Sequence, residues 1–382
     1  MKKIILMFIS CFLFGMDDFF EPGFSVGGYG ELHYNNQAVD DGDDATEDAD
    51  PTTLLDFHRY ITFINYNFTE KWSFKSELEL EHNFVSDGEG ELELEQAYVN
   101  YHDGNWGFGA GVVLISAGII NETHEPPTFL SVERPDYNKY IIPTTWFGNG
   151  MHLYGKFGDF NMKFVLHEDL DGENMFSIND NGTEDDGDAL NGDESEDDFL
   201  EWSGIRDGRA KGYKSTAYSW TKNMSFAYTG IEGIKLGGSY TTNNAPIDNV
   251  KENTVDVSLM EFNVGYNANN VVAAFEYGML GLAHSPEEGV PVLGDINGNG
   301  YYLDLGYNVA PLMGWNECKL MPWFRTGMYT KDDSDEDNAT NIMKLGLTYK
   351  PIDQISFKLD YGTDTKGETT TKKINLGVGY MF

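Results

Sequence analysis

The chain has little cysteine, little arginine and no long hydrophobic run beyond its N-terminus. Only two cysteines occur among 382 residues, and Cys11 lies in the N-terminal apolar run, so Cys318 has no partner once that run is removed. The absence of any later run of about 18 apolar residues excludes a membrane-spanning helix. The formal net charge of −38 disfavours nucleic-acid partners, because phosphate would be repelled.

Aromatic residues and glycine are abundant instead. An aromatic content of 14% is too high for a disordered acidic protein, and 43 glycines suit many tight turns. At the N-terminus, Lys2 and Lys3 precede the apolar run Ile4 to Phe14, which predicts a signal peptide over residues 1–15 with an indistinct cleavage site. Cys11 also permits a lipoprotein signal, although its flanks fit one poorly. Residues 16–382 are then expected to form a single domain.

Alternating apolar and polar residues predict strands throughout the chain. The last ten residues show the pattern clearly, with one apolar face made of Ile374, Leu376, Val378, Tyr380 and Phe382. Ending on an aromatic residue is common in the strands of outer-membrane barrels. The same pattern predicts sixteen strands in all: Phe24–Asn35, Leu54–Phe68, Trp72–Phe84, Glu91–Tyr101, Trp106–Ile119, Met151–Phe157, Asn161–His167, Met224–Thr229, Ile234–Thr242, Val255–Tyr266, Asn270–Leu280, Gly300–Val309, Leu320–Thr330, Asn341–Lys350, Ile355–Thr363 and Lys373–Phe382. Glu91–Tyr101 and Val255–Tyr266 change phase midway, which indicates bulges.

The connections between these strands alternate between long and short. The long ones are residues 36–53, 85–90, 120–150, 168–223, 243–254, 281–299, 331–340 and 364–372. A membrane barrel has short periplasmic turns and long extracellular loops, whereas a soluble sandwich has no reason to alternate in this way. The sequence therefore predicts an all-β fold, a transmembrane antiparallel barrel of sixteen strands around a water-filled channel. The last strand should close the barrel by pairing with both the first strand and Ile355–Thr363.

Charged residues in the strands fall mostly on the face opposite the apolar set. A lipid-facing charge at the bilayer midplane costs about 2–4 kcal/mol, so the charged face is expected to line the pore. The predicted pore-wall residues are Arg59, Lys75, Glu77, Glu79, Glu81, Lys156, Lys163, Arg325, Lys344 and Lys358.

Two of the long loops, 36–53 and 168–201, are strongly acidic and lack Lys and Arg. They are consistent with a solvated surface, with a negative funnel that concentrates cations, or with loose binding of Ca²⁺. A sharper calcium motif runs from Asp295 to Gly300, in which Asp295, Asn297 and Asn299 occupy alternate positions before a glycine, although Gly306 replaces the closing glutamate. No other cofactor is indicated, and the eight histidines show no metal-ligand spacing.

Most of residues 118–155 is predicted to be a loop, because this stretch has four prolines and no sustained alternation; it is also rich in aromatic residues, and such an apolar loop needs a surface on which to pack. It is expected to fold into the barrel as the third long loop. Here the sequence resembles the phosphate-selective porin O and P family, through Leu55–Tyr60, Glu91–Tyr101, Asn121–Pro127 and Ile142–Trp146. The resemblance implies a sixteen-stranded homotrimeric porin with an inward third loop. The predicted constriction residues are Glu122, His124, Glu125, Glu133 and Arg134; alternatively, these residues only hold the loop to the wall.

The chain departs from this family in charge. With only five arginines and many glutamates in strands 3 and 4, phosphate selectivity is not carried over. The leading prediction is an outer-membrane porin for passive diffusion of ions and small hydrophilic solutes, with a preference for cations. An anion or phosphate channel is the alternative, and it would need Arg206, Arg209, Lys211 and Lys214 to reach the lumen. A surface adhesin or structural barrel is a further alternative. An enzyme is not expected, because the Gly23–Gly27 match to a Gly-x-Ser-x-Gly motif lacks the strand and helix that such a motif needs.

Overall fold

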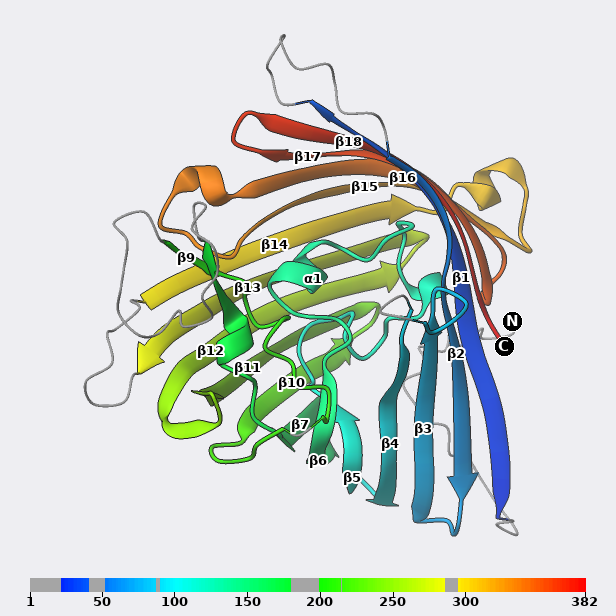
Figure 1. The fold of residues 1–382 in the computed structure, drawn as a ribbon. Helices are drawn as coiled ribbons and strands as arrows, with labels where there is room; N and C mark the ends of the chain where they lie inside the picture. The colour runs from blue at the N-terminus through cyan, green and yellow to red at the C-terminus, as the bar shows by residue number, and fades with distance from the viewer. Residues whose placement is uncertain (1–21, 41–51, 87–89, 180–198, 214, 286–294) are drawn as a thin grey trace.

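The polypeptide folds into a closed antiparallel β-barrel (Figure 1). The computed structural model describes residues 22–40, 52–86, 90–179, 199–213, 215–285 and 295–382. The predicted signal peptide (1–15) and most of the acidic stretches within 36–53 and 168–201 lie outside these residues. In the described part of the chain, no helix is both long and apolar enough to cross a membrane.

Sixteen strands make up the barrel, as the sequence predicts. They are β1 (Gly23–Asp40), β2 (Thr52–Asn67), β3 (Trp72–Glu81), β4 (Leu92–Asp103), β5 (Trp106–Leu114), β6 (Phe147–Phe157), β7 (Phe160–His167), β10 (Thr221–Ile231), β11 (Ile234–Ile247), β12 (Val250–Ala268), β13 (Val271–Ser285), β14 (Asp295–Tyr307), β15 (Lys319–Thr330), β16 (Thr340–Ile352), β17 (Ile355–Lys366) and β18 (Thr369–Met381). The strands β8 (Phe176–Asn179) and β9 (Phe199–Trp202), which the sequence did not predict, form a separate hairpin. The short helices are η1 (Pro126–Thr128), α1 (Tyr137–Tyr140), η2 (Glu173–Met175), η3 (Ala310–Met313) and η4 (Glu336–Asn338).

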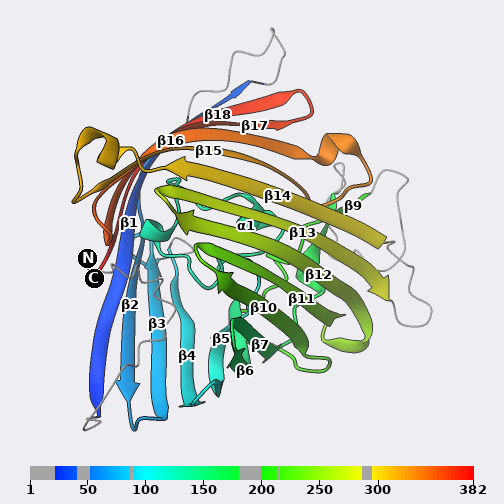
Figure 2. The same cartoon turned by 180° about the vertical axis from the view of Figure 1, so that it is seen from behind.

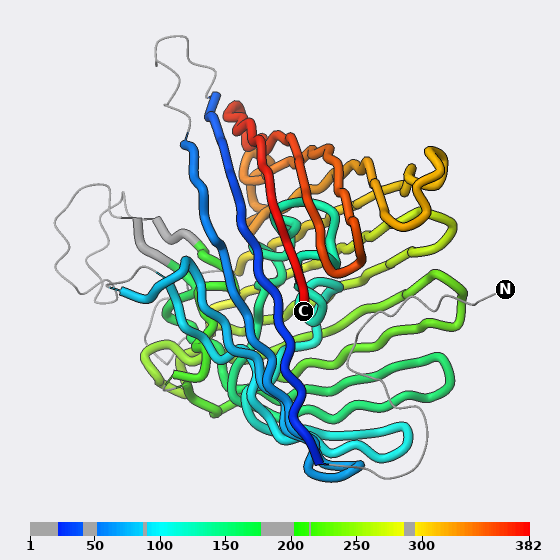
Figure 3. Tube along the Cα trace, turned by 90° about the vertical axis from the view of Figure 1, so that its right-hand side faces the viewer, coloured from blue at the N-terminus to red at the C-terminus, as the bar shows by residue number. Residues whose placement is uncertain are grey.

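The terminal strand closes the ring by pairing with both predicted neighbours. Antiparallel ladders join β18 to β1 and to β17, and Figure 3 shows the last strand running beside the first. At the end of the chain, the Phe382 amide donates to the Gly28 carbonyl at 2.9 Å and the Gly28 amide donates to the Phe382 carbonyl at 3.0 Å. Closure leaves the barrel with no free sheet edge.

The outer face of the barrel is apolar and the inner face is polar. On β18, the side chains of Ile374 and Leu376 are 46% and 47% exposed, whereas Asn375 between them is 3% exposed and faces inward. Large apolar side chains are exposed in the same way on strands all around the barrel, among them Trp72, Phe108, Phe164, Phe226, Phe262, Leu305, Leu345 and Phe357. Soluble monomers rarely expose apolar surface on this scale, but lipid covers it in a membrane barrel.

Two predicted loops are in fact tight turns. Residues 243–254 and 364–372 were expected to be long connections, but β11 and β12 extend to a turn at Asp248-Asn249, and β17 and β18 extend to a turn at Gly367-Glu368. Asp248, Asn249 and Gly367 have positive φ values of 53°, 59° and 54°, as hairpin turns require. These strands continue beyond the lipid-facing part of the barrel, and there apolar and polar residues do not have to alternate. The pattern therefore underestimated their length.

Only one of the two predicted bulges occurs at a phase change. In β4, Glu95 is the extra residue, because Gln96 pairs with Glu77 and Leu94 pairs with Leu78. In β12 the pairing with β13 is regular from Thr254 onward, so the predicted bulge is wrong there. The phase changes because Val255, Val257 and Leu259 are apolar residues that face inward, where they pack in a buried apolar cluster.

Candidate pore constriction

The inward loop, residues 115–146, lies inside the ring of strands, as Figures 1 and 2 show for the segment that carries α1. Its ends are held together by Asn121, whose side chain donates to the Ile115 carbonyl at 2.6 Å and accepts from the Trp146 amide at 2.8 Å. Ile141, Ile142 and other apolar residues of the loop pack with the inner faces of β12 and β13. The apolar content of this segment is thus explained by a buried surface within the barrel.

Four residues of the β16–β18 wall bind the backbone of the inward loop: Thr348, Lys350, Lys358 and Asp360, with Lys350 Nζ donating to the Pro127 carbonyl. Lys358 Nζ donates to the carbonyls of Pro126 and Ser131, at 2.7 Å each. The carboxylate of Asp360 accepts from the Val132 amide at 2.7 Å, and Thr348 donates to the Leu130 carbonyl at 2.5 Å. Because these contacts use backbone groups of the loop, the loop sequence alone could not indicate them.

The opposite wall, β1–β4, binds the loop through side chains. His124 Nε2 lies 3.3 Å from Glu77 Oε1 and 3.6 Å from Glu95 Oε2. Burial lowers the pKa of His124, but its two glutamate partners outweigh burial and raise that pKa to about 10. On the same side, Glu133 Oε1 lies 2.8 Å from His33 Nδ1. Burial raises the pKa of Glu133, but His33 outweighs it and holds that pKa well below its ordinary value.

Glu122 reaches the β7 wall, where its Oε1 lies 2.5 Å from Lys163 Nζ. The Ser116 hydroxyl donates to its other oxygen at 2.7 Å. Desolvation raises the pKa of Glu122, but Lys163 and Ser116 together lower it to about 2, so the carboxylate stays ionised at physiological pH. Its side chain is nevertheless 40% exposed and therefore faces open space within the barrel.

The structure separates the five predicted constriction residues by exposure. Glu122 is exposed, and Glu125, Glu133 and Arg134 are half-buried, so all four keep some exposed surface. His124 is the one buried member of the five, and its contact with Glu77 holds the loop against the wall. Arg134 Nη2 donates weakly to the His124 carbonyl at 3.4 Å.

The ten predicted wall residues belong to the inner face of their strands, and most contact the loop or another wall residue. Arg59 Nε lies 2.8 Å from Glu31 Oε1, and its Nη1 lies 3.2 Å from Glu79 Oε1. Arg325 forms two bonds to Asp304, at 2.6 and 2.7 Å. Lys344 lies 2.8 Å from Asp136, and Glu81 lies 3.8 Å from Arg59. Lys75 is half-buried, two residues before Glu77 on β3, and Lys156 is exposed at the end of β6.

Charge is distributed unevenly around the lumen. The inner face of β1–β4 is acidic and carries Glu31, Glu77, Glu79, Glu81, Glu93 and Glu95 against Arg59 and Lys75. The inner face of β15–β18 is basic and carries Arg325, Lys344, Lys350, Lys358 and Lys373, with Asp360 and Asp364 among them. The inward loop lies between these walls, so the space beside the loop is bounded by fields of opposite sign.

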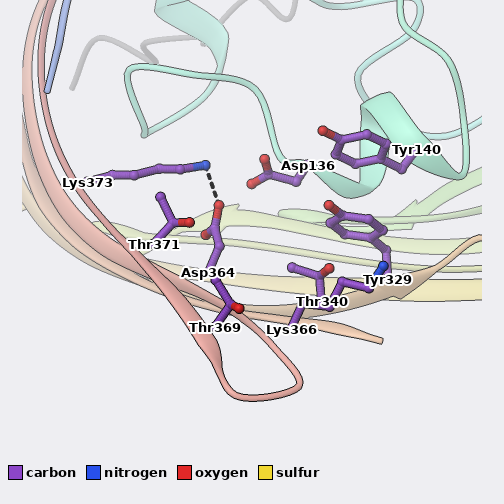
Figure 4. A pocket seen from close by; sticks show the side chains of 9 residues that line it. All are labelled: Asp136, Tyr140, Tyr329, Thr340, Asp364, Lys366, Thr369, Thr371 and Lys373. Atoms are coloured by element: carbon purple, nitrogen blue, oxygen red, sulfur yellow. Dashed lines mark hydrogen bonds and ion pairs between the residues drawn. The ribbon is translucent and has the colours of Figure 1, made fainter. Parts of the chain in front are cut away.

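A polar pocket of about 240 Å³ remains between the inward loop and the basic wall (Figure 4). On the wall side, Lys373 is ion-paired with Asp364. On the loop side, Tyr140 stacks on Tyr329 of β15 with ring centroids 4.3 Å apart, and Asp136 lies beside them. This pocket is an open space that touches both the inward loop and the wall, and it offers donors and acceptors of both charges.

A second long loop also enters the barrel, which the sequence did not predict. Asp169 accepts hydrogen bonds from the Tyr218 amide at 2.5 Å and from Asn243 Nδ2 at 2.9 Å. The apolar residues of this second loop, Met175, Trp202 and Ile205, belong to the same buried cluster as Ile141 and Ile142 of the inward loop. The signal was the set of apolar residues that flank the acidic run, and the acidity of the segment hid it.

The chain was compared with known proteins. No protein-family model matches it. Over 138 residues it is 47% identical to an uncharacterized protein of Aquifex aeolicus (strain VF5), a match that covers 35% of this chain and only 30% of that relative. Among solved structures it is similar to an anion-selective porin from Comamonas acidovorans (TM-score 0.57, 12% identity, 95% of this chain and 100% of the other). It is also similar to the outer membrane channel DcaP of Acinetobacter baumannii (TM-score 0.57, 12% identity, 97% of this chain and 100% of the other). OmpF of Salmonella typhi in complex with daunomycin gives comparable values (TM-score 0.56, 12% identity, 94% of this chain and 97% of the other). The chain has the porin fold.

Within that fold, one lysine of the basic segment that a phosphate channel would need is paired with acidic residues. Lys211 Nζ lies 2.8 Å from Glu91 Oε2 and also contacts Glu93. Arg209 donates to the Thr145 carbonyl at the end of the inward loop. Lys214 lies outside the described residues.

The structure places the three residues of the predicted calcium motif in a strand rather than in a loop. Asp295, Asn297 and Asn299 lie in β14, which pairs regularly with β13. Alternate residues of a strand are about 6.6 Å apart, so the three side chains cannot surround one ion. The asparagines and glycines of this motif belong to the first half of β14.

Proposed function

We propose that the protein is an outer-membrane porin for passive diffusion of ions and small hydrophilic solutes. The observation that carries the proposal is a closed sixteen-strand barrel with an apolar outer face and a charged inner face. The inward loop, attached to both walls, narrows the lumen and sets its charge. The solved structures of similar fold include channels and porins, and the resemblance to the phosphate-selective family adds the expectation of a homotrimer, which native mass measurement in detergent would test.

Cations are the preferred ions under this proposal. The acidic wall carries more carboxylates than the bases beside it can neutralise, and the exposed carboxylate of Glu122 stays ionised near neutral pH. The basic wall favours the opposite sign, but Lys344 is paired with Asp136 and Lys358 with loop carbonyls. An anion channel is therefore the alternative that the experiment must separate.

Purified protein in a planar bilayer under a KCl gradient tests both points. Stepwise current would support a channel, and a reversal potential of the cation-selective sign would support the acidic wall as the dominant field. The opposite sign would support the anion alternative. A barrel that gives no conductance would support an adhesin or structural role instead.

The variant Glu122→Gln sharpens this test. It removes one negative charge and leaves Lys163 without its partner, so the reversal potential should move toward anion selectivity. Glu232→Gln is the matched control, because Glu232 is an exposed residue in the short turn between β10 and β11. Equal reversal potentials in the wild type and Glu122→Gln would show that Glu122 only braces the loop.

A further inference from the structure

Three of the eight histidines gather on the inner wall, although their sequence spacing gives no metal motif. His33 comes from β1, His58 from β2 and His82 from the residue after β3. Asp56 completes one group with His58 and His82, and Glu133 of the inward loop completes a second with His33 and His58. In each group the ligand atoms lie within 4.8 Å of one another.

A bulge in β2 brings His58 into the barrel. Glu31 pairs with Arg59 and His33 pairs with Asp56, so Phe57 and His58 together stand opposite Leu32 alone. Without the extra residue, strict alternation would point His58 toward lipid, because the adjacent Arg59 faces inward. Bulges of this kind often re-aim a functional side chain.

The turn after β3 brings His82 to the same place. Its φ of 53° lies in the left-handed region, which non-glycine residues rarely adopt, and the next residue, Asn83, has a φ of 65°. The His82 amide donates to the His58 carbonyl at 3.3 Å, which fixes the turn against β2. As a result, Nδ1 of His82 lies 2.9 Å from Asp56 and Nδ1 of His58 lies 3.0 Å from the same carboxylate.

These separations are close to those of a metal site. Metal–ligand bonds of about 2.1 Å in a tetrahedral site place neighbouring ligand atoms about 3.4 Å apart, so the carboxylate and imidazole groups would separate by only a few tenths of an ångström. Two imidazoles and one carboxylate are three protein ligands, which leaves a fourth position for water. The His82 side chain is 46% exposed, so an ion can enter from the aqueous side.

We propose that Asp56, His58 and His82 bind one divalent transition-metal ion of the Zn²⁺ class on the inner wall of the barrel. Imidazole ligands favour Zn²⁺, Cu²⁺ and Ni²⁺ over Ca²⁺ and Mg²⁺, which prefer oxygen. His33 stacks on His58 with ring centroids 4.9 Å apart and binds Glu133, so it positions His58 and connects the site to the inward loop. Binding at this site needs no channel activity and is measured separately from it.

Calorimetric titration of the tag-free protein in detergent with ZnCl₂, in an excess of Mg²⁺, tests the proposal. The excess Mg²⁺ competes for sites made of carboxylates, so that Zn²⁺ binds only where imidazole ligands are present. One Zn²⁺ per chain is expected in the wild type, with affinity at least tenfold weaker in His58→Ala and in His82→Ala. His102→Gln, which removes a histidine at the far end of β4, should bind as the wild type does. Co²⁺ in place of Zn²⁺ should give a visible absorption band that the same two variants lose.

Three results would overturn the assignment. The first is a wild type that binds Zn²⁺ no better than the His58→Ala variant, when heat-dependent gel migration shows both to be folded. The second is unchanged binding in His82→Ala together with lost binding in His33→Ala, which would move the ion to the group with Glu133. The third is loss of binding in His102→Gln, which would place the ion elsewhere in the barrel.

Discussion

The single substitution Lys358→Met should loosen the inward loop from the basic wall. Lys358 Nζ donates to two loop carbonyls at 2.7 Å, and it lies 3.8 Å from the centre of the Phe129 ring. Methionine has a similar length and keeps the packing of the side-chain stem, but it has no donor. Both carbonyls, of Pro126 and Ser131, belong to buried residues and would lose their partner.

The expected size follows from these contacts. A hydrogen bond to a charged group contributes about 1.5–3 kcal/mol, so two such bonds contribute about 3–6 kcal/mol to holding the loop. Taking the lower figure, and about 1.4 kcal/mol for each tenfold change, the open form of the loop should become roughly 100 times more populated. The global stability of the barrel should change less, because the strand ladders of β16–β18 are untouched.

Hydrogen exchange measured on peptides that cover residues 126–134 reports this opening. The Val132 amide, which donates to Asp360 at 2.7 Å, should exchange roughly 100 times faster in Lys358→Met, in proportion to the open population. Lys319→Met is the matched control, because it removes an equal charge from an exposed pair with Asp353 in the short-turn end of the barrel. Unchanged exchange in Lys358→Met, or an equal rise in the control, would refute the reasoning.

Two further predictions concern charges in the barrel. Asp304→Asn leaves the buried guanidinium of Arg325 unpaired and should lower the free energy of unfolding by about 3–5 kcal/mol in urea titrations, whereas the double variant with Arg325→Met should recover much of the loss. His124 contributes stability that is complete below its unfolded pKa of 6.5 and that falls as pH rises toward its folded pKa of about 10. The thermal midpoint of the wild type should therefore drop between these pH values more than that of His124→Gln, and parallel curves for the two proteins would contradict this assignment.

The strands were predictable because the bilayer imposes one strict pattern on them. Each of the sixteen predicted segments overlaps one barrel strand, and the predicted partners of the last strand are its actual neighbours. The pattern weakens where lipid no longer contacts the barrel, and there the strand ends of β11, β12, β17 and β18 were missed. Where the inner face of a strand packs against a loop, as at Val257 in β12, the inward residue is also apolar. The alternation of apolar and polar residues then disappears from the sequence.

The site was less predictable, because its members come from distant segments. The inward direction of the loop followed from its apolar residues, but its partners Lys358, Asp360 and Glu77 are fixed by barrel closure and register. The approach of His58 to His33 depends on one extra residue in β2, and periodicity cannot place such a bulge. The sequence therefore predicted which residues lie on the lumen wall, but not which of these residues contact one another.

These pairings change what the net charge of the chain implies for conduction. Of the charges nearest the inward loop, Glu122, Glu133, Asp136 and Lys344 all have a partner of opposite sign or a histidine within 3 Å. The stretches 36–53 and 168–201 together carry 22 of the 63 acidic residues and no Lys or Arg, but fields from exposed charges are screened over about 10 Å at 0.1 M salt. A change that breaks one lumen pair, such as Glu122→Gln, should thus move the reversal potential more than the loss of one carboxylate from an exterior loop. This difference should widen as salt concentration rises, because partly buried charges are screened less.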